Sequence, residues 1–368
     1  MRGTGLNKMM AVALLAGAAA ACDTGTGPEA IATFDAEAAL EDYRSLDVVL
    51  SSDTWQGFQA LGAQMSFERI GAGPALAVGL AQELRAIESE ADAGSFASAL
   101  IARIDAAGGV VGTADALISD FHRGKTFVYD FTAKDYVVDP DRTGAPSNGV
   151  RFIVYEHDRL TGKPTSDVEI GYADLIDEGD GSAEDIALRL VVVMNGLTAL
   201  DYKTTVDNLG DDGAITVAGF LQDEQDRLDF DIAVQGSERG GQKAIDVSFE
   251  MGITARDFSI SGSVKGTEGD GSSGDIDVSV RHGSESLRVD VNGTDSEIAG
   301  TFYLNGQVFA TVSGDPDEPT FLGASGDPLT GPEVLVLLRM VGVLDDVFDL
   351  FEELVEPVGH LVILAVLL

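Results

Sequence analysis

The sequence predicts an α+β fold: an N-terminal helical region, then a large antiparallel β-meander that curls like an open barrel, with a C-terminal apolar helix packed on it. Three observations predict this class. Apolar residues recur at three- and four-residue spacing in the first third of the chain, as in amphipathic helices. From Lys125 onward they alternate with polar residues, as in strands with one buried face. The last part of the chain is unusually apolar.

Residues 1–21 have the features of a secretory leader. Arg2 and Lys8 are positive, an apolar stretch follows, and small residues lead directly into Cys22, the only cysteine. This layout resembles a bacterial lipoprotein signal, which implies that Cys22 is lipidated, for instance with palmitate, and becomes the mature N-terminus. The alternative is an ordinary leader cleaved at an A-x-A site, which would leave Cys22 as a free thiol. Lipidation explains a lone cysteine in an oxidising compartment better.

The resemblance implies a bacterial cell-envelope lipoprotein, at the periplasmic face or the cell surface. Residues 22–33 are small, polar and turn-prone, and so predict a flexible tether. Residues 34–122 then carry helical signals. Asp35 and Asp53 can cap helices, and Pro74 fits a helix start. We therefore expect a small helical region after the tether.

The segment 125–313 is predicted to be the sheet. Runs such as 228–234 and 245–251 place an apolar residue at every second position, with Asp, Ser or Glu between. Turn-forming residues separate about a dozen such runs, with no helix-length connection among them, which predicts an antiparallel meander and excludes a parallel Rossmann-like sheet. A one-faced sheet of this width must curl.

Residues 314–331 are rich in Pro, Gly and Asp, and predict a linker. The tail, 332–368, has two apolar stretches separated by acids and by Pro357. Each stretch is about 11 residues long, short of the about 20 that a membrane-spanning helix needs. We therefore expect a C-terminal apolar helical segment that packs on the sheet; a final strand at 361–368 is the alternative.

The charge limits the partners. The chain has 62 acidic residues against 23 Lys and Arg, a formal net charge of −39. Such a field repels phosphate groups, so no nucleic-acid partner is expected. Hydrophobic residues make up 45% of the chain, which is enough for a folded core.

Motifs of known catalytic chemistry are missing from the sequence. It contains no G-x-S-x-G, no H-E-x-x-H, no Walker loop and no G-x-G-x-x-G after a strand. The four histidines lie far apart, and a lone histidine beside acids is more often exposed or satisfied than a ligand: His122, His157, His282 and His360. We therefore predict no enzyme, no catalytic residue and no cofactor, with Cys22 as the one modified site.

Calcium is the only metal whose binding motif the sequence partly matches. Residues 139–144 have the oxygen spacing and the glycine of the first half of an EF-hand loop, but position 12 is Val150, where a bidentate glutamate is required. Acidic turns such as 177–185 and 207–213 are interpreted as hairpin turns, in which Asp, Asn and Gly are favoured. No metal site is predicted.

The predicted function is therefore a non-catalytic structural or interaction role in the envelope. The expected partners are the membrane, through the lipid anchor, and an envelope protein. The alternative is a carrier or receptor that binds a hydrophobic ligand in the concave face of the sheet. That alternative resembles the open barrels of lipoprotein-transport carriers in inferred shape alone.

Overall fold

The structure is a computed structural model, and it describes residues 120–330 with short gaps, together with a few single residues elsewhere. The gaps are 158–163, 180–184, 208–211, 240–241, 269–272, 295 and 316–317, and the single residues are Ile118, Glu333 and eight positions between 41 and 54.

Fifteen strands make up the described chain. Their bounds are β1 (Lys125–Asp130), β2 (Asp135–Asp139), β3 (Gly149–His157), β4 (Pro164–Asp177), β5 (Asp185–Met194), β6 (Leu197–Asp207), β7 (Asp212–Gln222), β8 (Arg227–Arg239), β9 (Gln242–Ile253), β10 (Phe258–Glu268), β11 (Ser273–His282), β12 (Glu285–Thr294), β13 (Ile298–Leu304), β14 (Gln307–Asp315) and β15 (Glu318–Gly323).

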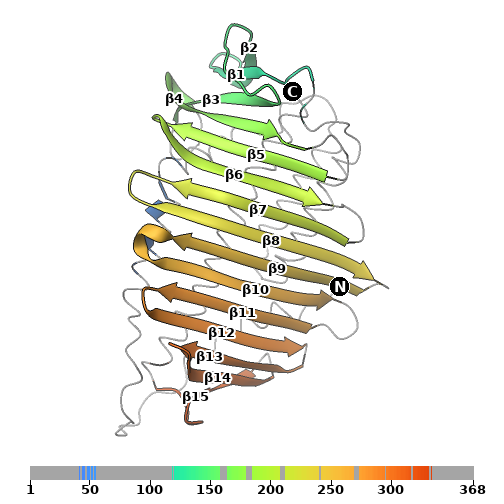
Figure 1. The fold of residues 1–368 in the computed structure, drawn as a ribbon, viewed down its shortest axis with the longest axis vertical. Coiled ribbons are helices and arrows are strands. Elements are labelled where there is room, and N and C mark those ends of the chain that lie inside the picture. Colours follow the sequence, from blue (N-terminus) through green and yellow to red (C-terminus); the bar gives the residue numbers. More distant parts are fainter. Residues whose placement is uncertain are drawn as a thin grey trace. The chain divides into compact units, whose positions relative to one another are not determined.

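The strands follow one another in the sheet in chain order from β15 back to β3, followed by β1 and then β2 (Figure 1). Every pair with a defined register is antiparallel except β1–β3, which is parallel. The predicted antiparallel sheet is therefore confirmed. The chain divides into two compact units within β8, between Asp231 and Ile232.

In the unit that contains β1–β7, directly opposed residues on neighbouring strands form one apolar row and one polar row. The apolar row is at most 1% exposed and consists of Phe152, Ala173, Val192, Leu200 and Leu221. The adjacent row on the other face consists of Arg151, Asp174, Val191, Asp201 and Phe220. Period-2 alternation thus separates the buried face from the face that carries the ion pairs.

The unit that contains β9–β15 repeats this arrangement. Its apolar row consists of Phe249, Gly262, Val278, Val289 and Phe302, and the adjacent polar row consists of Ser248, Ser263, Asp277, Asp290 and Thr301. The glycine at position 262 is required sterically, because a Cβ there would lie 3.0 Å from Cζ of Phe249 and 2.6 Å from the carbonyl oxygen of Asp277. The glycine leaves room for the Phe249 ring to lie across the neighbouring strand.

Two hairpin turns explain how adjacent long strands connect directly. Asn195 and Gly196 join β5 to β6 with φ of 51° and 84°, and Asn305 and Gly306 join β13 to β14 with φ of 49° and 74°. Two consecutive left-handed residues are typical of a type I′ turn, whose twist matches that of the flanking strands. The Asn-Gly pairs therefore fix the register of these hairpins.

The α+β class predicted from the sequence is wrong. The described residues are 72% strand and contain no α-helix, and no C-terminal apolar helix is found on the sheet. A few single described residues outside the sheet, such as Glu41 and Glu333, have helical backbone. The segments predicted to be helical, 34–122 and 332–368, lie almost entirely outside the described residues. In the described part of the chain, no helix is long and apolar enough to cross a membrane.

The error has a physical cause. Apolar residues at three- and four-residue spacing are a weak indicator, since most helical stability in proteins comes from packing of the amphipathic face against a partner. Period-2 alternation is a stronger indicator here, because every described strand except β15 and β2, at the ends of the strand order, is supported by neighbours on both sides. Strand β15 lies within 314–331, the segment predicted to be a linker, and pairs Phe321 with Val312 of β14.

We expect Thr126→Val to stabilise the protein. The Thr126 side chain is 1% exposed, and its Oγ1 has no hydrogen-bond partner among the described residues. Valine has the same shape without the unsatisfied hydroxyl, so the free energy of unfolding should rise by about 1 kcal/mol. Chemical denaturation measures this change. The control is Thr165→Val, which removes an exposed hydrogen bond to Glu156 O (3.2 Å) and should not stabilise. A lower stability of Thr126→Val would contradict the assignment.

Candidate functional site

The residues singled out from the sequence are not gathered into one site. Cys22 and His360 lie outside the described residues. His122 is buried in the turn before β1, and its ring contacts those of Phe121 and Phe127. His157 and His282 are the last residues of β3 and β11. Among the described residues, no three His, Cys, Asp or Glu side chains are grouped so that they could hold a metal ion.

In the half EF-hand loop, the carboxylate of Asp139 contacts groups of the protein itself. Asp139 accepts a hydrogen bond from the backbone N–H of Asp141 (3.0 Å), and its other oxygen lies 3.4 Å from Nε of Arg142. Arg142 also binds both carboxylate oxygens of Glu169 on β4. The positive charge beside this loop is therefore a guanidinium of the chain itself.

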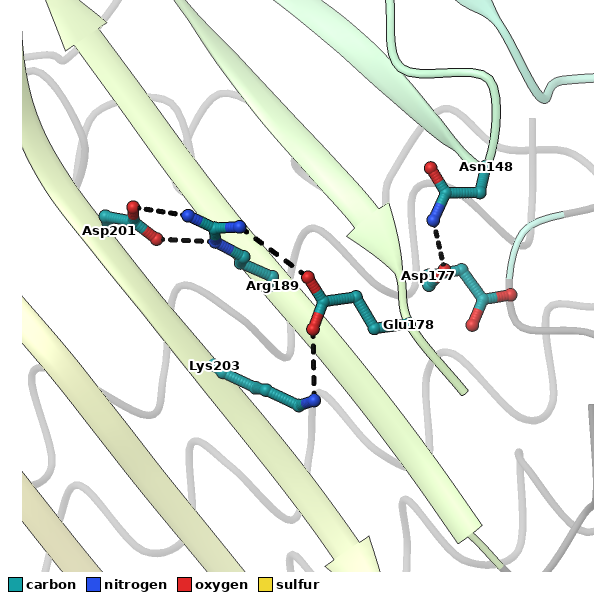
Figure 2. Close-up of polar contacts among 6 residues, drawn as sticks. All are labelled: Asn148, Asp177, Glu178, Arg189, Asp201 and Lys203. Carbon is teal, nitrogen blue, oxygen red and sulfur yellow. Dashed lines mark hydrogen bonds and ion pairs between the residues drawn. The ribbon is translucent and has the colours of Figure 1, made fainter. Parts of the chain in front are cut away.

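The candidate site is a network of charged side chains on the polar face of β4, β5 and β6 (Figure 2). Arg189 on β5 donates from Nε and Nη2 to the two carboxylate oxygens of Asp201 on β6, at 2.8 and 2.7 Å. Its Nη1 lies 3.7 Å from Glu178, just beyond β4, and the other oxygen of Glu178 lies 3.0 Å from Nζ of Lys203. Two cations and two carboxylates, from β5, β6 and the turn after β4, thus form one chain of contacts.

The strand register creates this network. Arg189 lies directly opposite Lys203, and Asp201 is two residues from Lys203 on the same face of β6. The long Arg189 side chain therefore reaches its carboxylate diagonally. The pKa of the Arg189 guanidinium is raised above its ordinary value, chiefly by the hydrogen bonds to Asp201, although partial burial opposes the shift.

The acidic turn after β4 is held by the same kind of contact. Asp177 accepts a hydrogen bond from Nη2 of Arg123 at 2.9 Å, and its backbone carbonyl accepts one from Nδ2 of Asn148 at 2.7 Å (Figure 2). The backbone N–H of Asp177 donates back to Asn148 O at 2.9 Å. The described carboxylates of this turn, Asp177 and Glu178, therefore hold cations of the protein itself.

Among the ion pairs of the described residues, the most buried joins β3 to β4. Arg151 donates from Nε and Nη2 to Asp174 at 2.6 Å each, and the two side chains are 19% and 11% exposed. The guanidinium carbon also lies 3.7 Å from the ring centroid of Tyr172. Hydrogen bonding to Asp174 raises the pKa of Arg151, and burial opposes the shift. A planar guanidinium suits both contacts at once.

Similar contacts recur within hairpins farther along the chain. Lys265 of β10 lies 3.1 Å from Asp246 of β9, and Arg288 of β12 donates twice at 2.9 Å to Asp277 of β11. Sequence reasoning missed these pairs. Their signal is a basic residue at a polar position of one strand with an aspartate opposite, or two residues removed, on the next. That signal can be found only once the register is known.

Comparison with known proteins gives no relative: no protein-family model, curated protein or solved structure matches the chain. The chemistry of the site must therefore be inferred from its own geometry. The network neutralises part of the charge and links neighbouring strands. The remaining carboxylates of the polar face determine the sign of its net charge.

We expect Arg151→Met to be strongly destabilising, because it leaves the mostly buried Asp174 without its partner. Breaking a fully buried pair costs about 3–5 kcal/mol, so this partly exposed pair should cost about 2–3 kcal/mol in free energy of unfolding. The matched control is Arg288→Met, whose pair with Asp277 is 48% and 49% exposed and should cost about 1 kcal/mol or less. Denaturant titrations of both variants measure the difference. Equal losses in the free energy of unfolding would show that burial does not determine how much these ion pairs contribute to stability.

The Arg142–Glu169 pair predicts a dependence of stability on acid pH. Hydrogen bonding to Arg142 holds the pKa of Glu169 below its ordinary value of 4.5. The pair therefore contributes its full stability above about pH 4.5, and the contribution is lost as pH falls through the lower folded-state pKa. Glu169→Gln should lose a small stability increment at pH 7 and approach the wild type near pH 3. Melting temperatures across this range test this; an offset that stays constant with pH would contradict it.

Proposed function

We propose that this chain is a lipid-anchored bacterial envelope protein with a non-catalytic structural or interaction role. The leader and Cys22 support the anchor by their sequence layout. The large sheet with segregated faces supports a role in which a folded surface, rather than a reactive centre, is the functional part.

The observation that carries the structural role is the burial of the apolar face. Met251 and Val278 are 2% exposed and Phe302 is 3% exposed. A site that accepts an acyl chain needs an apolar cavity of several hundred Å³. Side chains that line such a cavity have surface open to it, whereas nearly all of the surface of these three side chains is covered by other atoms of the protein. Their burial supports the structural role over the carrier.

The polar face supports interaction with cationic or neutral partners. Several of its arginines are engaged in contacts within the sheet: Arg151, Arg189 and Arg288. Because the chain has 62 acids against 23 Lys and Arg, carboxylates remain in excess. An acidic surface attracts basic groups on an envelope partner and repels nucleic acid.

We expect Cys22→Ser to move the protein from the membrane fraction to the soluble fraction without changing its unfolding curve. The reason is that the lipid is attached at this one side chain, which precedes the polar tether. Cells fed an alkyne-labelled palmitate should label the wild type but not the variant. The released protein should carry no lipid in native mass spectrometry, because the side chains of the apolar face are already buried.

Two results would separate the parts of this proposal. A Cys22→Ser protein that still fractionates with membranes would contradict the anchor. A stoichiometric lipid bound to the soluble protein would instead support the carrier.

A further inference from the structure

The chain contains four Asn-Gly pairs, and each is a candidate for spontaneous deamidation. They begin at Asn148, Asn195, Asn292 and Asn305. In such a pair the backbone nitrogen of the glycine can attack Cγ of the asparagine, because glycine has no side chain to obstruct the approach. All four asparagines are exposed to solvent. The sequence therefore does not distinguish the four pairs, but the structure does.

At Asn148 both reacting groups are held. Its Nδ2 donates a 2.7 Å hydrogen bond to Asp177 O (Figure 2), and the N–H of Gly149 donates to Pro146 O at 3.0 Å. A Cβ at Gly149 would lie 2.2 Å from Leu175 O, so the glycine is also enclosed. The attack requires the side chain to turn toward the glycine and the glycine nitrogen to lose its proton. These contacts oppose both steps.

Asn292 and Asn305 are held in other ways. Asn292 and Gly293 lie within β12, where both are paired with residues of β11 and of β13. The Oδ1 atom of Asn305 accepts a 2.8 Å hydrogen bond from the backbone N–H of Ser286, near the start of β12. The Asn305 side chain is therefore fixed, although its turn has the same left-handed backbone as the turn at Asn195.

Asn195 lacks these restraints. In the part of the chain that the structure describes, neither its side chain nor the N–H of Gly196 has a hydrogen-bond partner. A Cβ added at Gly196 would meet nothing within 4 Å. Asn195 is anchored through its main chain, whose N–H donates to Ile170 O at 2.8 Å. The side chain is therefore able to turn toward a glycine nitrogen that is free to lose its proton.

We propose that Asn195 is a site of spontaneous modification, where deamidation is much faster than at the other three Asn-Gly pairs. The Gly196 nitrogen loses its proton and bonds to Cγ of Asn195. The bond from Cγ to Nδ2 breaks, and Nδ2 takes up a proton and leaves as ammonia. Water then opens the resulting succinimide at one of its two carbonyl carbons, which leaves either aspartate or isoaspartate. No oxidant or reductant is consumed.

The modification affects the hairpin that carries the candidate site. Both products add a negative charge, and isoaspartate also adds a carbon atom to the backbone of a two-residue turn. This turn fixes the register of β5 and β6, in which Arg189 and Asp201 meet. Isoaspartate should therefore weaken the hairpin more than aspartate, which accepts left-handed backbone. The inference goes beyond the function proposed above and does not depend on it.

The test incubates the folded full chain in heavy-oxygen water at mildly alkaline pH and follows each Asn-Gly pair by peptide mapping. Deamidation replaces the side-chain nitrogen with an oxygen from the solvent, so the mass of each peptide fragment identifies the modified pair. Asn195 should react at least tenfold faster than Asn148, Asn292 and Asn305. In denaturant the four rates should agree within threefold, because glycine follows each asparagine.

Two matched variants test the consequence for stability. The melting temperature of the wild type should fall during incubation, in proportion to its isoaspartate content. Asn195→Asp should keep its initial melting temperature over the same time, because a carboxylate is attacked more slowly than an amide. Asn305→Asp makes the same change in the turn between β13 and β14, and its melting temperature should fall as that of the wild type does.

Two results would overturn the proposal. The first is a folded protein in which Asn148, Asn292 or Asn305 reacts as fast as Asn195, because the contacts of these residues would then not control the rate. The second is an Asn195→Asp protein that loses stability during incubation as fast as the wild type, because the loss would then come from another site.

Discussion

Strand register is the constraint on which the two faces of this protein depend. Side chains alternate between the faces with a period of two, so a slip of one residue would move an entire apolar row to the polar face. Steric fit enforces the register at particular positions. A side chain at Gly262 would collide with Phe249, and one at Gly300 would place its Cβ 2.5 Å from Cγ2 of Val291. Each glycine therefore permits one alignment of large neighbours and makes a shifted alignment costly.

The ion pairs use the same register for a different purpose. A chain with so many acids must limit repulsion across its polar face, and several cations of the described strands lie where they meet a carboxylate of a neighbouring strand. The clearest cases bridge the two strands of one hairpin: Arg151–Asp174, Arg189–Asp201, Lys265–Asp246 and Arg288–Asp277. Contacts within a hairpin are local in sequence and have a low entropic cost of closure. Charge neutralisation therefore forms together with each hairpin.

The sequence was sufficient to predict the antiparallel sheet, because period-2 alternation is a local property of the chain. Strand β1 begins at Lys125, where the period changes. The sequence was not sufficient to predict helices, because apolar residues at helical spacing stabilise a helix mainly when they pack against a partner. It also missed the candidate site. Arg189 and Asp201 are twelve residues apart, and only the alignment of β5 with β6 places them side by side. Strand β15 was missed because it is short and lies within the segment 314–331, which is rich in Pro, Gly and Asp.

At β15 the chain covers its own sheet edge. Leu322 of β15 forms an antiparallel bridge with Pro328, and Pro319 within the same strand has no N–H to donate. A proline and a covering segment prevent a further strand from pairing there, whatever the charge of that strand. This edge is therefore protected by the backbone of the chain itself, whereas the polar face relies on charge: its ion pairs join neighbouring strands, and its excess of carboxylates opposes association with other acidic surfaces.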